Sequence, residues 1–432
     1  MVETTTRPAA ADIDTGRNVY DVLAERGYIA EVSDEAGLRA ALAEPGSRPV
    51  TLYVGFDATG TSLHIGHLLS IMVLKHMQLH GHRPIALCGG GTTMIGDPTD
   101  KATTRPILTV EQIAHNLAAI RAQFARYLDF DSDQPNRALL LNNADWLLDL
   151  KYIEFLRDIG KHFTVNQMLS HSTYRDRLAT GSLNFIEINY VLLQSYDFLH
   201  LFRNFGCTLQ FGGGDQWFNV LAGADLIRRV DGGQAFAAVT PLLETADGRK
   251  MGKTEAGATW LDPAQTSPYE FYQFWINVDD ADVIRLLKLY TFLPLDEITA
   301  LGRLEGAELR QAKEVLAFEA TRISHGEAAA RQAQTESRAL FGGAGAAGAG
   351  APTTTVPRAE LANGMALLDL LVTSGLVKSK GEGRRLVAQG GAYVNGTVVE
   401  DAEARLTLAD SQDGAILLRA GKKRYARIVV EG

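Results

Sequence analysis

The sequence predicts an α/β fold with an open sheet, because short apolar strands alternate with helices and several strands lead into glycine-containing turns. Residues 50–53 have the apolar, partly β-branched character of a strand, and residues 68–79 carry apolar side chains at helical spacing. Two further apolar runs, residues 84–88 and 208–211, lead directly into glycines that are followed by an aspartate. In open α/β sheets, glycines and a carboxylate at the carboxyl end of a strand typically bind a nucleotide.

Length and composition limit the classes of protein. A chain of 432 residues is long enough for two or three domains, and its hydrophobic content of 46% is ample for a core. The formal net charge of −9 excludes a basic protein that coats polyanions. Cys88 and Cys207 are predicted to be buried thiols in a reducing compartment. Neither a secretory leader nor an apolar run of about 18 residues is present, so we expect a cytoplasmic protein.

The remaining elements are predicted from periodicity and composition. In order, the expected segments are a disordered tail (1–17), a helix (18–27), the strand–turn–helix unit (50–80), a helix (109–128), a strand (139–141), a helix (184–202), a largely helical region (263–340) and a flexible Gly/Ala/Thr/Pro linker (342–356).

The turn between the first strand and its helix is predicted to bind phosphate. Thr61 or Ser62 is the expected N-cap, and a helix that begins beside glycines presents free N–H groups and a positive dipole end. His64 and His67 add donors on the same side, and Gly66 leaves room for a flat ring. Taken alone, the two histidines could also be zinc ligands, although no further ligands lie nearby in the sequence, or ordinary surface residues.

Polar residues after the second strand and along the helix 184–202 are candidates for binding a substrate. Asp97 is a fixed anion in a turn, which suits an ammonium group, although a plain turn aspartate explains the residue equally well. One face of the helix carries a polar stripe that meets solvent, a neighbouring helix or a ligand: Glu187, Tyr190, Gln194 and Asp197.

Two later loops carry further candidates. Asp215 is suited to accept a ribose hydroxyl and Gln216 to meet a carboxylate, or both belong to a plain loop. Residues 247–254 form a basic, glycine-flanked loop, a pattern that is most often a solvated run of charge.

Residues 357–432 are predicted to be a separate small domain. It contains 11 Lys plus Arg against 9 Asp plus Glu, a net charge of about +2 in an otherwise acidic chain. Its basic residues gather on a predicted helix-turn-helix and near residues 422–427, and Asn395-Gly396 between apolar runs predicts a hairpin.

Several motifs, in this order, resemble those of bacterial-type tyrosyl-tRNA synthetases, which are class I aminoacyl-tRNA synthetases. They are His64-Ile65-Gly66-His67, Gly96-Asp97-Pro98, the set Tyr190, Gln194 and Asp197, Gly212-Gly213-Gly214-Asp215-Gln216-Trp217, and Lys250-Met251-Gly252-Lys253-Thr254. The segment 376–396 also resembles a small RNA-binding module first known from a ribosomal protein.

The resemblance implies an architecture and an activity. It implies an open parallel Rossmann-like catalytic domain (18–260), a helical anticodon-side domain (261–341), a small C-terminal α+β RNA-binding domain (357–432) and a homodimer. The implied activity is that of a tyrosine-tRNA ligase, which converts L-tyrosine and ATP, with Mg2+, to tyrosyl-adenylate and pyrophosphate and then charges tRNA(Tyr). No protein-bound metal is expected.

The resemblance also assigns roles to residues. The catalytic set is Thr59, His64, His67, Lys250 and Lys253. The tyrosine-binding set is Tyr53, Asp97, Tyr190, Gln194, Asp197 and Gln216. The ATP-binding set is Gly55, Asp57, His64, Gly66, His67, Lys101, Arg105, Gly213, Asp215, Lys250, Lys253 and Thr254. The tRNA-binding set is Lys378, Lys380, Arg384, Arg385, Lys422, Lys423 and Arg424.

Four positions depart from the usual pattern without removing a charge: Val54, Ala58, Gly91 and Gly252. Two rival interpretations are a tryptophanyl enzyme, against which Tyr190, Gln194 and Asp197 argue, and an RNA-binding scaffold that has lost catalysis.

Overall fold

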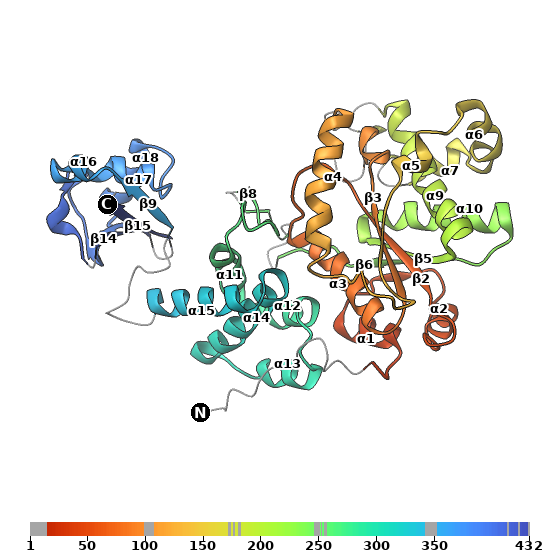
Figure 1. Cartoon of the computed structure of the whole chain (residues 1–432), viewed down its shortest axis with the longest axis horizontal. Helices are drawn as coiled ribbons and strands as arrows, with labels where there is room; N and C mark the ends of the chain where they lie inside the picture. Colours follow the sequence, from red (N-terminus) through yellow and green to blue (C-terminus); the bar gives the residue numbers. More distant parts are fainter. Residues whose placement is uncertain are drawn as a thin grey trace. The chain divides into compact units, whose positions relative to one another are not determined.

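The computed structural model describes residues 15–98, 108–171, 174–175, 178–179, 183–245, 251, 253–254, 257–341, 352–412, 414–421 and 424–430. The chain divides into two compact units, residues 1–326 and 327–432, which are described separately (Figure 1). Among the helices of these residues, none combines the length and hydropathy that crossing a bilayer requires.

The first unit contains the open, largely parallel sheet that the sequence predicts. Its strands are β1 (Glu31–Val32), β2 (Thr51–Phe56), β3 (Arg83–Cys88), β4 (Leu139–Asn142), β5 (Cys207–Gly213) and β6 (Phe236–Thr240). The spatial order is β1-β6-β5-β2-β3-β4, and all neighbours are parallel except the short edge pair β1 and β6. The chain runs outward from β2 through β3 and β4, and then builds β5 and β6 on the other side of β2. The carboxyl end of β2 is therefore the point of topological reversal, where open sheets bind ligands.

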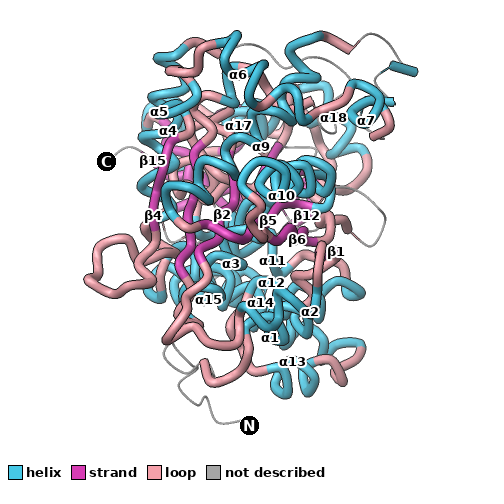
Figure 2. The backbone as a smooth tube through the Cα atoms, turned by 90° about the vertical axis from the view of Figure 1, so that its right-hand side faces the viewer, coloured by secondary structure: helices cyan, strands magenta, loops and turns pink. Residues whose placement is uncertain are grey.

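Helices cover both faces of this sheet. They are α1 (Val19–Arg26), α2 (Glu35–Ala41), α3 (Ile65–Leu79), α4 (Val110–Phe124), α5 (Ala144–Leu147), α6 (Tyr152–Asp158), α7 (Val165–Leu169), α9 (Phe185–Phe205) and α10 (Trp217–Asp231). Figure 2 shows the strands between α9 and α10 on one side and α3 on the other. Tyr53 and Ile85 of the sheet pack with Phe198 and Leu199 of α9 in one buried cluster. The Cys88 and Cys207 side chains are buried thiols, as predicted.

The helical region after the sheet is attached to it by hydrogen bonds. Its helices are α11 (Pro268–Ile276), α12 (Val283–Tyr290), α13 (Leu295–Leu301) and α14 (Leu309–His325). The buried guanidinium of Arg26 donates to the carbonyls of Lys288, Thr291 and Leu293 at 3.0, 2.9 and 2.7 Å, which satisfies the end of α12. The Tyr290 hydroxyl donates to the Ile65 carbonyl in the first turn of α3 at 3.1 Å. The helical region therefore holds the start of α3 directly.

The structure shifts some predicted boundaries. Helix α1 follows the prediction, with Asn18 as N-cap and Gly27 as left-handed C-cap. Helix α9 continues to Phe205, three residues beyond the predicted end, and stops where Gly206 takes φ +62°. The predicted N-cap of α3 is wrong, because the Ser62 hydroxyl donates to the Leu63 carbonyl and lies within hydrogen-bond distance of Gln123.

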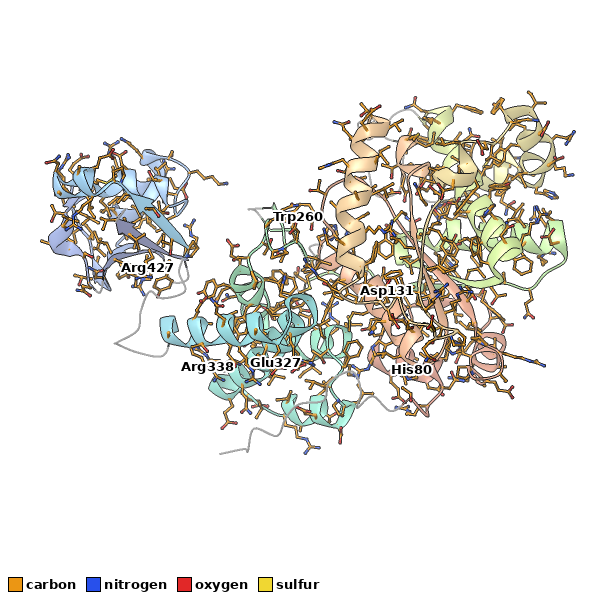
Figure 3. All side chains as sticks on the ribbon, viewed as in Figure 1. His80, Asp131, Trp260, Glu327, Arg338 and Arg427 are labelled. Atoms are coloured by element: carbon orange, nitrogen blue, oxygen red, sulfur yellow. The ribbon has the colours of Figure 1, made fainter. Side chains whose placement is uncertain are left out.

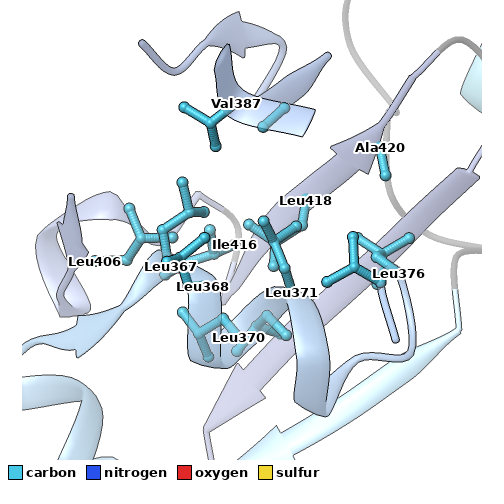
Figure 4. Packing of buried hydrophobic residues seen from close by; sticks show 14 of the residues in the cluster. Leu367, Leu368, Leu370, Leu371, Leu376, Val387, Leu406, Ile416, Leu418 and Ala420 are labelled. Atoms are coloured by element: carbon cyan, nitrogen blue, oxygen red, sulfur yellow. The ribbon is translucent and has the colours of Figure 1, made fainter. Parts of the chain in front are cut away.

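The second unit is a small α+β domain preceded by a helix. It contains α15 (Glu327–Phe341), β9 (Thr353–Val356), α16 (Arg358–Ala362), β10 (Met365–Ala366), α17 (Leu367–Thr373), α18 (Lys380–Ala388), β11 (Ala392–Val394), β12 (Thr397–Val398), β13 (Arg405–Leu406), β14 (Ala415–Ala420) and β15 (Arg424–Val430). Five strands form a sheet in the order β12-β11-β14-β15-β9, and the leucines of α17 pack on Ile416 and Leu418 of β14 (Figure 4). The predicted hairpin is present, since Val394 pairs with Thr397 across Asn395 and Gly396, whose φ angles are +49° and +86°.

Candidate active site

The histidine turn at the start of α3 is organised by its own side chains. His64 is the N-cap, because its Nδ1 accepts the Gly66 N–H at 3.0 Å, and the Nδ1 of His67 accepts the His64 N–H at 3.1 Å. The two rings stack with centroids 3.9 Å apart. A neutral imidazole whose Nδ1 accepts carries its proton on Nε2, so both rings have the tautomer that can donate to a phosphate.

The structure gives a local reason for glycine at position 66, and the sequence alone does not reveal it. A Cβ atom at this position would lie 2.8 Å from Cε1 and 3.0 Å from Nδ1 of His64. Any other residue would therefore displace the capping ring. Glycine here protects the position of His64.

The strand-like segment 259–261 is paired with the histidine turn. The Ile65 N–H donates to the Thr259 carbonyl at 3.1 Å, and the Leu261 N–H donates to the Leu63 carbonyl at 2.8 Å. Just upstream, β7 (Lys253–Thr254) and β8 (Gly257–Ala258) form a two-stranded hairpin. The chain that follows the predicted lysine loop is therefore fixed to the turn that carries His64.

The glycine loop after β3 rests on two asparagines at the end of β4. The Gly90 and Gly91 N–H groups donate to the side-chain oxygens of Asn142 and Asn143 at 3.1 and 2.8 Å. A Cβ at Gly89 would meet the Asp57 carboxylate at 2.8 Å. A Cβ at Gly91 would meet Leu147 at 3.1 Å, which gives a local reason for glycine at one of the departures noted above.

Asp197 of α9 is the most unusual ionisable group of the site. Its carboxylate is buried, and it accepts the Asn143 amide at 2.8 Å and the Trp146 indole N–H at 2.7 Å. Burial raises the pKa of Asp197 to about 7, although both hydrogen bonds act to lower it. The His200 ring stacks on the Trp146 indole with centroids 4.3 Å apart.

The Tyr53 ring of β2 lies with its centroid 5.4 Å from that of Phe198, the residue after Asp197 on α9. Burial raises the pKa of the Tyr53 phenol, and the charge of Asp197 raises it further. The Tyr53 hydroxyl is buried and has no hydrogen-bond partner among the described residues. A buried polar group without a partner costs free energy, so a ligand that supplies one is favoured here.

A second polar cluster joins β3 to β5. The Gln216 amide donates to the Asp97 carboxylate at 2.8 Å, and the Asn219 amide donates to the Gln216 oxygen at 3.1 Å. Asp97 is buried. Burial raises the pKa of the Tyr174 phenol, and the charge of Asp97 raises it further. Gln216 therefore orients Asp97.

The other predicted residues differ in how they are placed. Tyr190 is buried and Gln194 half-buried on α9, on the same face as Asp197, whereas Glu187 caps its own helix by accepting the Asn184 N–H at 2.9 Å. Five other predicted residues lie at or beyond the carboxyl ends of β2 and β5: Gly55, Asp57, Thr59, Gly213 and Asp215. A Cβ atom at Gly55 would have no atom within 4 Å.

Several predicted residues lie partly or wholly outside the described residues. Six of them lie wholly outside the described residues: Lys101, Arg105, Lys250, Gly252, Lys422 and Lys423. For Lys253 and Thr254, only the backbone is described. Within the described residues, no group of three or more His, Cys, Asp or Glu side chains is placed to hold a metal ion.

Sequence reasoning missed Asn143 and Trp146 as parts of the site. The available signal was their position, since both follow the carboxyl end of β4 within a few residues, where polar side chains of an open sheet converge.

Comparison with known proteins agrees with this geometry. Residues 45–342 match the model of the family tRNA synthetases class I (W and Y), and residues 349–428 match the tyrosine–tRNA ligase SYY-like C-terminal domain. The tyrosine–tRNA ligase of Clostridium botulinum strain Hall is 51% identical over 414 residues, which is 96% of this chain and 100% of the relative. That of Acetivibrio thermocellus is 49% identical over 411 residues, 95% of this chain and 99% of the relative.

Solved structures share this fold. A C-terminally truncated mitochondrial tyrosyl-tRNA synthetase from Aspergillus nidulans superposes with a TM-score of 0.66 at 30% identity, covering 77% of this chain and 97% of the other. A tryptophanyl-tRNA synthetase from Encephalitozoon cuniculi shares the fold at a TM-score of 0.52 and 15% identity, covering 76% of this chain and 92% of the other. The chain therefore belongs to the class I tRNA synthetases of the tryptophan and tyrosine group, and within that group to the bacterial-type tyrosyl-tRNA synthetases.

Proposed function

We propose that this chain activates L-tyrosine with ATP, releasing pyrophosphate, and then transfers the tyrosyl group to the 3′ end of tRNA(Tyr). The observation that carries the choice of tyrosine is that the buried carboxylate of Asp197 is accompanied by the Tyr53 hydroxyl, which has no hydrogen-bond partner among the described residues. A phenol both donates and accepts a hydrogen bond, so it satisfies both groups at once. A phenyl ring satisfies neither.

The amino group of the substrate has its own set of partners in this proposal. Asp97 supplies the negative charge for the ammonium group, and its orientation is supported by the hydrogen bond from Gln216. Tyr190 and Gln194, on the same helix face as Asp197, complete the set. Gln216 is also proposed to meet the tyrosine carboxylate through its amide.

Adenylate formation is proposed to depend on positioning and charge stabilisation. The tyrosine carboxylate attacks the α-phosphate, and pyrophosphate leaves. The Nε2–H groups of His64 and His67 are donors at the start of α3, where the helix dipole also favours negative charge. Thr59, Lys250 and Lys253 are proposed to stabilise the leaving pyrophosphate, and Mg2+ accompanies ATP as part of the substrate. In the second step, a terminal ribose hydroxyl of the tRNA attacks the adenylate carbonyl. The bond from that carbonyl carbon to the phosphate oxygen breaks, AMP leaves with the phosphate oxygen, and the hydroxyl gives up its proton.

ATP contacts beyond these groups are proposed for the loops around the strand ends. Asp215 is suited to the ribose hydroxyls, and Gly55, Gly66 and Gly213 allow the nucleotide to approach the backbone. Asp57, Lys101, Arg105 and Thr254 complete the proposed ATP set.

Tyrosine-dependent exchange of pyrophosphate into ATP tests the proposal. The full chain is expected to support exchange with tyrosine, and far less with phenylalanine or tryptophan. Exchange driven best by tryptophan would favour the tryptophanyl alternative. No exchange with any amino acid, together with tight tRNA binding, would favour the catalytically inactive scaffold.

Homodimer formation is proposed from exposed apolar side chains on α6, α7 and α9 and at the C-cap of α5. These four helices lie at one end of the first unit (Figure 1). Large exposed apolar patches of this kind mark protein interfaces. Its members are Leu148, Tyr152, Ile153, Val165 and Phe185, of which Ile153 is 73% and Phe185 67% exposed.

Light scattering on purified protein tests the dimer. The unchanged chain is expected at twice the monomer mass, and Phe185→Asp is expected to shift it to monomers. Val110→Asp is a matched control, because Val110 is an exposed valine on α4, outside this set. A monomeric unchanged chain would contradict the proposal.

The second unit is proposed to bind tRNA through Lys378, Lys380, Arg384, Arg385, Arg424 and the neighbouring Lys422 and Lys423. Two of these cations are already paired, Lys380 with Asp369 at 2.5 Å and Arg384 with Glu403 at 3.2 Å. The cytoplasmic location remains a prediction from the sequence.

A further inference from the structure

The five-stranded sheet of the second unit has two chemically different faces. Ile416, Leu418 and Ala420 of β14 and Ile428 of β15 belong to the buried cluster under α17 (Figure 4). Since side chains alternate along a strand, the residues between them point to the opposite face. We call this the outer face; its residues include Val398, Tyr393, Leu417, Arg419, Tyr425, Arg427 and Thr353.

Three planar side chains form a row across the outer face. Tyr393 of β11 pairs in register with Arg419 of β14, and Arg419 pairs with Tyr425 of β15. The Arg419 guanidinium carbon lies 3.5 Å from the Tyr393 ring centroid and 5.9 Å from that of Tyr425. Each of the three is partly exposed. The row is therefore a contiguous set of planar groups from three adjacent strands, in which the Arg419 guanidinium lies over the Tyr393 ring.

The charge of this sheet is positive. Its five strands contain Arg419, Arg424 and Arg427 and no Asp or Glu. Within the described residues, none of these arginines forms an ion pair, whereas two of the cations near α18 are paired with carboxylates. Figure 3 labels Arg427, which neighbours Leu417 and Thr353 in register on the outer face.

We propose that the outer face binds an unpaired stretch of the tRNA, with a base stacked on the Tyr393–Arg419–Tyr425 row and a phosphate near Arg427. This rests on the proposed function, which makes tRNA a substrate, and adds a contact on the outer face to those predicted around α18 and at residues 422–424. Unpaired bases stack on aromatic rings and on guanidinium planes, and arginines beside them bind the backbone. The composition of the outer face disfavours a protein partner. Among the described residues, Val398 is the one large apolar residue of this face that is strongly exposed.

Substitutions that remove one stacking ring test the proposal in the full chain. Tyr393→Leu and Tyr425→Leu are each expected to weaken binding of a tRNA(Tyr) transcript about tenfold, within the range for loss of one stacked base. Their salt dependence should match that of the unchanged chain, because no charge is lost. Arg427→Gln is expected to lower the slope of log Kd against log salt by about 0.7–0.9.

Matched variants separate stacking from folding. Tyr393→Phe and Tyr425→Phe keep the ring and should bind as the unchanged chain does, and Thr355→Val alters an exposed residue of the neighbouring strand without removing a ring or charge. Photo-crosslinking of tRNA to the unchanged chain, which needs no variant, should label the peptides that contain Tyr393 or Tyr425. Unchanged tRNA affinity in folded leucine variants, or crosslinks confined to other peptides, would overturn the proposal.

Pyrophosphate exchange distinguishes this failure from failure of the proposed function. Normal tyrosine-dependent exchange with unaltered tRNA affinity in the leucine variants would refute the outer-face contact alone. Absence of exchange in the unchanged chain would refute the ligase.

Discussion

Replacing Asp197 with Asn separates the charge of the proposed tyrosine pocket from its shape. Burial raises the pKa of Asp197 to about 7, whereas an aspartate in an unfolded chain titrates near about 3.9. The folded protein therefore holds this proton more tightly than the unfolded chain does. The stability that depends on this group is highest below about pH 4 and falls as the pH rises to about 7. About three pKa units correspond to a loss of up to about 4 kcal/mol.

Chemical denaturation of the full chain at pH 5 and pH 8 measures this effect. The quantity compared is the difference in free energy of unfolding between Asp197→Asn and the unchanged chain. The pH-dependent contributions of all other titrating groups are the same in both proteins and cancel in this difference. From pH 5 to pH 8, the unchanged chain is expected to lose about 2–3 kcal/mol of stability relative to Asp197→Asn. The Asn side chain has only one oxygen, so its NH2 group faces one of the two donors, the Asn143 amide or the Trp146 indole N–H. This mismatch lowers the stability of the Asp197→Asn protein at both pH values by about 1–3 kcal/mol.

Catalysis should report the same ionisation. A carboxylate accepts the phenol hydrogen bond more strongly than a neutral group does, so kcat/KM for tyrosine in pyrophosphate exchange should rise through about pH 7 in the unchanged chain. Asp197→Asn should be slower and flat over this range, with a smaller preference for tyrosine over phenylalanine. The exposed Asp149→Asn is the control and should leave both profiles unchanged. A stability difference that stays constant between pH 5 and pH 8 would refute the reasoning.

Three further predictions address the phosphate contacts, the support of the tyrosine pocket and the second unit. His64→Ala and Lys253→Ala should each raise the activation free energy of adenylate formation by about 2–4 kcal/mol without altering tyrosine binding in equilibrium dialysis, because their partners gain charge only in the transition state; a parallel loss of tyrosine affinity would contradict these roles. His200→Ala removes the ring stacked on Trp146 and should lower the tyrosine-to-phenylalanine ratio in exchange, and His200→Phe should restore it; an unchanged ratio in His200→Ala would exclude a supporting role. A chain that ends near Gly350 should keep pyrophosphate exchange and lose most tRNA charging, with a smaller salt dependence of tRNA binding, and charging at the full rate would show that the second unit does not bind tRNA.

The sequence predicts the backbone of the site better than its hydrogen bonds. Strand β2, its turn and α3 follow from local periodicity, and the alternating strands and helices predict the sheet. The N-cap does not follow, because Ser62 is near Gln123, 61 residues away, and His64 takes its place. Local pattern also cannot show that Asn143 and Trp146 meet Asp197, since those pairs are 54 and 51 residues apart in the chain. The resemblance identified Asp197 because it carries information about contacts between distant segments.

The hydrogen bond from Tyr290 to the Ile65 carbonyl has a consequence for how variants of this chain are interpreted. Helix α12 contributes no residue to the proposed tyrosine pocket, yet its last residue, Tyr290, is hydrogen-bonded to the turn that carries His64 and His67. Arg26 ties the chain just after α12 to α1. Mutations at this junction are therefore expected to appear as catalytic defects in a screen for adenylation, although they touch no substrate. Screens that select positions by distance from the tyrosine pocket would miss them.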